Sequence, residues 1–226
     1  LDEQVAHPGR EKRKLPKRFY RKAEAGPHEG GFAILLDGRI VRTPSKQPLA
    51  VPVPALAEAL AAEWDAQQDE IDPRSMRLTK LANTAIDLVA PRRDQVIAEI
   101  VNFAGTDLLC YRAEAPDALV ERQTALWDPL LGWAAEQGVS FTVTSGLMHV
   151  PQPQGSLDAY GRTVAALDPF RIAGLHNAVT LTGSAILGLA VALGRLTPEE
   201  AFDIAHLDEH WQMEISGRDE EEEARL

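Results

Sequence analysis

Residues 30–43 read GGFAILLDGRIVRT, and this stretch sets the fold class at the start of the chain. Two runs of strand-forming residues stand on either side of Asp37-Gly38, and an Asp-Gly pair between such runs is a strong signal for a tight β-hairpin. Residues 47–53 can supply another strand, which ends at prolines. The sequence therefore predicts a small antiparallel sheet near the N-terminus.

From Pro54 onward the apolar residues recur at the spacing of a helix instead of a strand. Leu56, Leu60 and Trp64 form the first such stripe, and Asp72-Pro73 ends that helix. Among the later segments, residues 139–143 have strand character. Further helices are predicted over residues 75–89, 92–104, 117–137 (with a kink at Asp128-Pro129), 156–167, 175–194 and 197–215.

This order of elements predicts an α+β fold with two domains. Residues 1–88 are expected to form a small N-terminal antiparallel β-rich α+β domain, with a basic arm at residues 1–18. Residues 89–226 are expected to form a mostly α-helical C-terminal domain that ends in an acidic tail. Residues 178–194 are apolar but shorter than the roughly 20 residues that span a bilayer, so they predict a central core helix and no membrane insertion.

Composition and charge narrow the functional classes. The chain has 226 residues, a net charge of -11 and a single cysteine, Cys110, which excludes an intrachain disulfide, suits a reducing compartment and is expected to be a buried thiol. Residues 10–22 hold eight of the 23 basic side chains, whereas residues 23–226 carry 15 basic and 31 acidic ones. An acidic body repels phosphate backbones, so nucleic-acid binding could come only from the basic arm. The arm lacks the interleaved aromatic residues of a stacking platform, so no nucleic acid is expected as a partner.

The common signatures of enzymes are missing from the sequence. Residues 183–188 have the glycine spacing of a phosphate-binding loop, but Leu189-Ala190 follow where a lysine and a hydroxyl would be needed. Neither a Gly-x-Ser-x-Gly elbow nor a dinucleotide-binding fingerprint is found. The sequence therefore predicts a protein that is not an enzyme.

The last predicted helix begins at a recognisable signal. Thr197-Pro198 followed by Glu200 is the signature of a capping box with proline at the first helical position. Apolar residues at helical spacing predict a buried stripe, formed by Ile204, Leu207, Trp211 and Ile215.

A second face of this helix carries titratable residues. His206, His210 and Glu214 lie at successive i, i+4 positions, so the face is a metal site, a partner-binding surface or a solvated surface. His206-x-x-Glu209-His210 matches the H-x-x-E-H pattern of zinc peptidases. A third protein ligand would have to be Glu214 or the acidic tail, so no metal is expected, and a zinc-dependent peptidase is kept as the alternative function.

Several ordered blocks match the pattern of one protein family, namely residues 63–67 (EWDAQ), 71–87 (IDPRSMRLTKLANTAID), 106–112 (TDLLCYR), 127–130 (WDPL) and 209–214 (EHWQME). Through them the chain resembles the assembly chaperones of F-type ATP synthase that hold the α subunit of the catalytic head before it pairs with β. The resemblance extends from Lys17 to Gly217. The chain departs from the family at Arg77, where proline is usual, and at Ser216, where tryptophan is usual.

The resemblance implies a two-domain fold, no cofactor and no chemistry on a substrate. It implies an ATP-independent chaperone that binds the unassembled α subunit, shields its interface from aggregation and hands it to β. The chain is expected to be a monomer when free. A bacterial cytoplasm is the expected location, with the mitochondrial matrix as the alternative.

Partner binding is expected on the acidic face of the last helix, where a charged rim would supply specificity. Trp64 or Trp127 could be apolar anchors, and core packing is the alternative for both. The residues predicted to bind the partner are Asp208, Glu209, His210, Gln212, Glu214, Trp64, Asp65 and Trp127.

Overall fold

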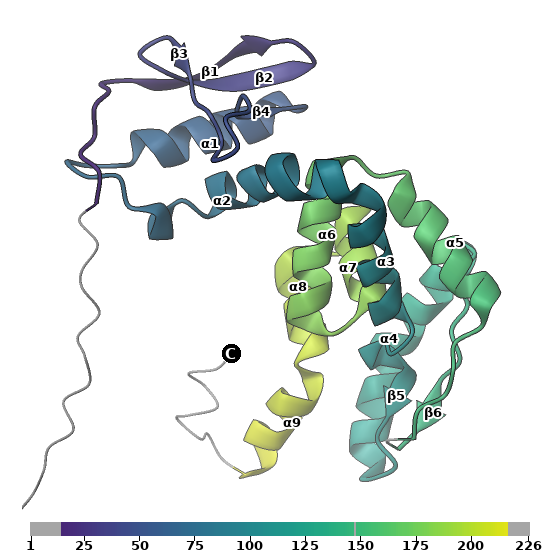
Figure 1. Cartoon of the computed structure of the whole chain (residues 1–226). Helices are drawn as coiled ribbons and strands as arrows, with labels where there is room; N and C mark the ends of the chain where they lie inside the picture. The colour runs from purple at the N-terminus through teal and green to yellow at the C-terminus, as the bar shows by residue number, and fades with distance from the viewer. Residues whose placement is uncertain (1–14, 147, 217–226) are drawn as a thin grey trace, which may run out of the picture. The chain divides into compact units, whose positions relative to one another are not determined.

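The computed structural model describes residues 15–146 and 148–216, so the acidic tail and most of the basic arm lie outside the described residues. The chain divides into two compact units, Leu1–Asn83 (unit 1) and Thr84–Leu226 (unit 2). The sequence-based boundary, after residue 88, lies slightly further along the same helical stretch. An antiparallel sheet followed by a mostly helical region confirms the predicted α+β fold class (Figure 1).

The sheet of unit 1 is antiparallel, and its second strand pairs with each of the other three. The predicted hairpin is confirmed, because Leu36 pairs with Arg39 across a turn in which Asp37 and Gly38 have φ values of 48° and 79°. Positive φ at both central residues matches the twist of the flanking strands. The strands are β1 (Ala23–His28), β2 (Gly31–Leu36), β3 (Arg39–Ile40) and β4 (Ala50–Val51).

Helix α1 (Pro54–Asp65) packs against β1 and β2 (Figure 1). Burial of apolar side chains between the sheet and α1 stabilises unit 1 by about 1.5–3 kcal/mol for each large side chain. A short turn, η1 (Pro73–Ser75), then leads to α2 (Arg77–Thr84). The main side chains of this core are Ala33, Ile34, Leu49, Val51, Ala57 and Leu60.

Unit 2 is mostly helical, and its one pair of strands among the described residues is the parallel pair β5 (Tyr111–Arg112) and β6 (Thr144–Ser145). The predicted strand at residues 139–143 is wrong, because these residues have no strand partner. The helical elements are η2 (Ala85–Val89), η3 (Ala90–Arg92), α3 (Arg93–Ala104), η4 (Leu108–Cys110), α4 (Asp117–Glu136), α5 (Gln154–Ala165), α6 (Pro169–Thr182), α7 (Ala185–Ala192), α8 (Pro198–Ala205) and α9 (Leu207–Ser216).

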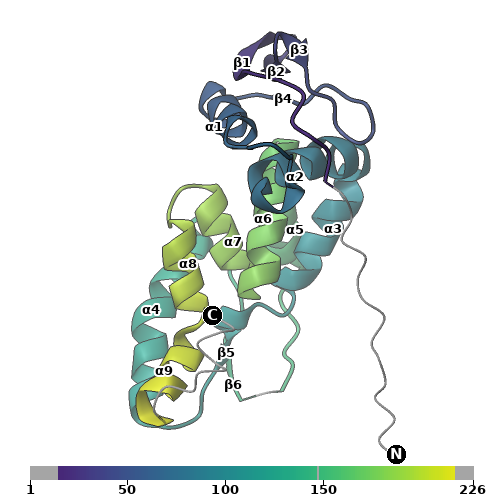
Figure 2. The same cartoon turned by 90° about the vertical axis from the view of Figure 1, so that its left-hand side faces the viewer.

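Helix α7 is the centre of unit 2, as the apolar run predicts. All its residues from Ala185 to Ala190 are buried, and the helix packs against α3, α4, α6 and α8 (Figure 2). A Cβ atom on Gly188 would lie 2.5 Å from Val179 Cγ2 of α6, so only glycine allows the two helices to approach this closely.

The single helix predicted over residues 175–194 is wrong. Gly183, with φ of 66°, ends α6 in the left-handed conformation. Ser184 then begins α7, because its Oγ accepts a hydrogen bond of 3.1 Å from the Leu187 N–H. Because the residue that ends α6 is followed directly by the residue that begins α7, the apolar run forms two helices.

A buried carboxylate holds this turn in place. Asp107, which is fully buried, accepts hydrogen bonds of 2.9 Å from the N–H groups of Leu109 and Ile186, and the Ser184 hydroxyl donates to both of its oxygens. Burial raises the pKa of Asp107 to about 6. The carboxylate therefore ties η4 to the start of α7.

Cys110, at the end of η4, is fully buried, and the predicted buried thiol is confirmed. Burial, assisted by the charge of Asp107, raises the pKa of the Cys110 thiol to about 12. A thiol with this pKa stays protonated at neutral pH, so it is a packing group and not a nucleophile.

The last predicted helix is also two helices. The capping box is confirmed, because Thr197 Oγ1 accepts from the Glu200 N–H at 3.2 Å and the Glu200 carboxylate accepts from the Thr197 N–H at 2.8 Å. Helix α8 ends at Ala205, and His206 leaves helical geometry with φ of -97° and ψ of 26° before α9 begins.

The break at His206 changes which residues of α9 are covered. Leu207 is buried, Trp211 is half-buried and Ile215 is 61% exposed. The predicted buried stripe is therefore wrong at Ile215, because α9 turns its C-terminal half toward solvent after the break.

Candidate partner-binding surface

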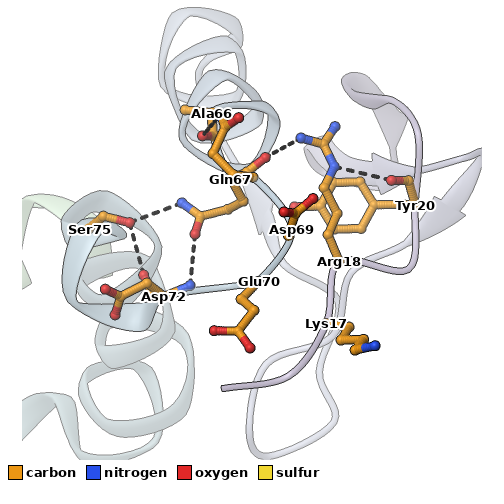
Figure 3. Close-up of a pocket in the computed structure, with 10 residues that line it drawn as sticks. Lys17, Arg18, Tyr20, Ala66, Gln67, Asp69, Glu70, Asp72 and Ser75 are labelled. Atoms are coloured by element: carbon orange, nitrogen blue, oxygen red, sulfur yellow. Dashed lines mark hydrogen bonds between the residues drawn. The ribbon is translucent and has the colours of Figure 1, made fainter. Parts of the chain in front are cut away.

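In unit 1, a polar network occupies the family block around residues 63–75. The Arg18 guanidinium donates to the backbone carbonyls of Asp65 and Gln67 and forms an ion pair of 3.0 Å with the Asp65 carboxylate. The Gln67 amide donates to Ser75 Oγ at 3.0 Å and accepts from the Asp72 N–H at 2.8 Å (Figure 3). These bonds fix the loop that follows α1.

An open pocket of about 970 Å³ lies beside this network, with Lys17, Asp69 and Glu70 among its lining residues (Figure 3). Its lining contains both cations and carboxylates, and Arg18 and Gln67 are hydrogen-bonded within the chain itself. The network around residues 63–75 therefore stabilises the fold of unit 1.

The structure places two predicted partner-binding residues next to this network. Trp64 is half-buried, packs edge-on against Tyr20 with ring centroids 5.9 Å apart, and accepts a 2.7 Å hydrogen bond from the Tyr20 hydroxyl at its carbonyl. Asp65 is exposed and pairs with Arg18. Both residues attach the N-terminal segment to α1, and their role toward a partner stays a prediction.

Trp127 belongs to the core of unit 2. Its side chain is 1% exposed, and the indole N–H donates to the Ile204 carbonyl at 3.1 Å. The Arg112 guanidinium lies over the ring at 5.1 Å from its centroid and pairs with the Asp128 carboxylate at 2.7 Å. The prediction of Trp127 as a surface anchor is wrong, because no face of this indole is open to a partner.

The H-x-x-E-H pattern straddles the break between α8 and α9. His206 Nδ1 lies 2.8 Å from the Phe202 carbonyl, and the two rings stack at 4.0 Å, so this imidazole faces α8. Within residues 15–146 and 148–216, no three His, Cys, Asp or Glu side chains are grouped as metal ligands.

Two of the predicted carboxylates of α9 are held by α4. Asp208 accepts from the Gln123 amide at 2.8 Å, and Gln123, which is 1% exposed, also accepts from the Ala113 N–H at 2.9 Å. Glu214 accepts two hydrogen bonds from Arg122, of 2.9 and 3.0 Å, and these bonds lower the pKa of Glu214. Asp208 and Glu214 are therefore already engaged within the chain, and their role toward a partner stays a prediction.

Two further predicted residues of α9, Glu209 and Gln212, are exposed to solvent. The Glu209 carboxylate has no hydrogen bond or ion pair with any residue that the structure describes. Gln212 is exposed and donates to Ser216 Oγ at 2.7 Å.

A groove of about 330 Å³ lies between three helices of unit 2. Each helix contributes residues three or four positions apart, which share one helical face. Arg122 and Leu126 come from α4, Glu200, Asp203 and Ile204 from α8, and Leu207, His210 and Glu214 from α9. Of the predicted residues, only His210 and Glu214 line the groove.

Arg122, Leu126 and Asp203 line the groove but are not among the residues predicted from the sequence. Arg122 and Leu126 lie one turn apart in α4, so their spacing shows that they share a helical face. The spacing does not show whether another helix covers that face. An apolar groove with a carboxylate rim is the kind of surface with which a binding protein holds another chain.

Comparisons with known proteins agree with a binding protein that holds another chain. The model of the ATP12 chaperone protein family matches residues 17–135. Mitochondrial protein atp12 of Schizosaccharomyces pombe is 24% identical over 209 residues, which cover 87% of this chain and 72% of that protein.

Two bacterial crystal structures are similar over almost the whole chain. Atp12 from Paracoccus denitrificans is 50% identical with a TM-score of 0.87, covering 92% of this chain and 90% of that one. Atu1473, a putative chaperone from Agrobacterium tumefaciens, is 48% identical with a TM-score of 0.86, covering 93% and 80%.

The chain belongs to the ATP12 chaperone family, whose members assist the assembly of ATP synthase. The resemblance seen in the sequence is thereby confirmed. The family is one of chaperones and not of enzymes, so the prediction that the chain is not an enzyme is confirmed, and the alternative of a zinc-dependent peptidase is wrong. No helix in the described part of the chain has the length and apolar character to cross a membrane.

Proposed function

We propose that this chain is an ATP-independent chaperone that binds the unassembled α subunit of F-type ATP synthase, shields its subunit interface from aggregation and hands it to the β subunit. The observation that carries the proposal is membership of the ATP12 chaperone family, together with bacterial relatives of about 50% identity. A subunit of an obligate oligomer exposes an apolar surface before assembly, and such a surface aggregates when it stays uncovered.

Features of the chain support release without nucleotide hydrolysis. The sequence has no Gly-Lys-Ser/Thr motif to hold a phosphate, which supports a release in which β competes with the chaperone for the same surface of α. The exposed carboxylates of α9, Glu209 foremost, give the contact a charged rim that speeds encounter and adds less to affinity. The chain acts as a monomer, in a bacterial cytoplasm or, alternatively, in the mitochondrial matrix.

Dilution of denatured α into buffer tests this function directly. The soluble fraction of α should rise with added chain and level off near an equimolar ratio, and it should rise equally when apyrase removes all ATP. The β subunit, diluted in the same way, is the specificity control and should gain no solubility. Added β should then release the chain from the soluble complex. The proposal fails if α aggregates to the same extent with and without the chain.

A further inference from the structure

The groove between α4, α8 and α9 has an apolar floor. Leu126 is 43% exposed although it is a large apolar residue, Ile204 beside it is half-buried, and Leu207 closes the bottom with 3% exposure. Covering apolar surface is favourable by about 25 cal/mol for each Å² removed from water, so this floor favours contact with another apolar side chain.

The rim of the groove is acidic. Among the residues that the structure describes, Arg122 is the one Lys or Arg that lines it, and this cation is already bound to Glu214 by two hydrogen bonds and stacked on Trp211 at 5.0 Å. Glu200 accepts from the backbone at the start of α8. Asp203 is exposed and has no hydrogen bond or ion pair with the residues in the described ranges. An incoming cation therefore finds Asp203 unoccupied, three residues from Glu200 on the same helical face.

We propose that this groove binds a segment of the α subunit in which an apolar side chain has a lysine or arginine within about four positions of it. The apolar side chain covers Leu126 and Ile204, and the cation pairs with Asp203. The proposal rests on the function proposed above and specifies its contact. A volume of 330 Å³ is at the small end of ligand pockets, which suits one or two side chains of a protein segment.

A matched pair of leucine variants tests the floor. Leu126→Asp places a charge in the groove, whereas Leu181→Asp places the same charge on another exposed leucine of unit 2, in α6, that does not line the groove. We expect Leu126→Asp to raise the chain concentration that keeps half of diluted α soluble by about tenfold, since a buried interface contact contributes more than 1 kcal/mol. Leu181→Asp should match the wild type.

Asp203→Asn tests the rim. This variant should raise the half-effective concentration by about two- to fivefold and should weaken the dependence of capture on salt, because an exposed charge acts mainly on the encounter rate. Circular dichroism should give all three variants the melting temperature of the wild type.

A photoreactive benzoylphenylalanine placed at Leu126 identifies the occupant in the full chain, with the same group at Leu181 as the control. The proposal expects a crosslink from Leu126 to α, at an apolar residue within about four positions of a lysine or arginine, as on one helical face. A crosslink to a segment of α without a cation, a crosslink to a second copy of the chain, or equal crosslinking from both positions would overturn it. If the wild-type chain itself does not keep α soluble, the proposed function fails; if it does and Leu126→Asp behaves as wild type while folded, only the groove is wrong.

Discussion

Two arginine and tryptophan pairs in unit 2 have the same chemistry in different surroundings. Arg112 lies 5.1 Å from the Trp127 ring, and Arg122 lies 5.0 Å from the Trp211 ring. The Arg112 side chain is 8% exposed, whereas that of Arg122 is 38% exposed. A cation over an aromatic ring is worth about 0.5–1 kcal/mol in water and about 2 when desolvated, so only the first pair is expected to hold the fold together.

The two pairs also differ in their hydrogen bonds. At the buried pair, Arg112 Nε also donates to the Leu109 carbonyl at 3.0 Å, and the Trp127 N–H donates to Ile204, so both side chains are fixed by the backbone. At the exposed pair, Arg122 donates to the Glu214 carboxylate, which is itself 58% exposed. The same pair of residue types can therefore hold the core together in one place and form an exchangeable surface contact in another.

The largest expected effect separates the two tryptophans. Trp127→Ala should lower the free energy of unfolding by about 3–5 kcal/mol, because it opens a cavity in the core. Trp211→Ala should cost about 1–2 kcal/mol, since this half-buried ring loses less contact on truncation. Chemical denaturation measures both values. Equal losses would mean that α9 is packed as tightly as α4.

Asp107, which lies just before η4, is buried like Arg112 and is also held by hydrogen bonds to the backbone. Asp107→Asn should lower the free energy of unfolding by about 1–3 kcal/mol at pH 7, because the new NH₂ group faces N–H donors in place of an acceptor oxygen. Denaturation at pH 7 measures this loss. Asp107→Ala, which removes the acceptor altogether, is the control for simple truncation.

The pH dependence of this variant has a defined sign. The pKa of Asp107 is raised from 3.8 to about 6 in the folded state, so the folded chain binds the proton more tightly than the unfolded chain. The contribution of Asp107 to stability is therefore present at low pH and is lost as pH rises from about 4 to 6. The gap between wild type and Asp107→Asn should widen by about 1 kcal/mol between pH 7 and pH 5. A constant gap over this range would show that Asp107 titrates outside it.

Local signals explain what the sequence predicts correctly. The hairpin follows from Asp37-Gly38 between two strand-forming runs, and the start of α8 follows from the capping box at Thr197. The core helix follows from an apolar run without charges. Each feature depends on residues within a few positions of one another, and such features can be read before any tertiary contact is known.

The errors arise where tertiary packing decides. Gly183 and Ser184 are individually good signals for a helix end and a helix start, but they lie inside an apolar run that also fits one long helix. The break at His206 has no glycine or proline to announce it. The groove needs one face from each of three helices, and periodicity alone gives neither the pairing of those faces nor the exposure of Leu126.

The smallest expected effects on stability concern the exposed ion pair of Arg122 and Glu214. Arg122→Gln and Glu214→Gln should each leave the melting temperature close to that of the wild type, because both side chains are well exposed to solvent. Arg112→Gln is the matched control and should lower it clearly, because it removes a buried cation from its carbonyl and carboxylate acceptors.

Capture of α should respond to the two exposed variants in opposite directions. Arg122→Gln removes the one Lys or Arg side chain that lines the groove in residues 15–146 and 148–216, and it leaves Glu214 free for a cation of the α subunit, so the association rate should rise by about two- to threefold at low salt. Glu214→Gln leaves Arg122 without its carboxylate and should slow association by a similar factor. Both differences should vanish above about 0.5 M salt, where charges further apart than a few ångström no longer interact. If instead both variants slow association and the changes persist at high salt, the pair holds α9 in shape, and the distinction between the buried and the exposed arginine disappears.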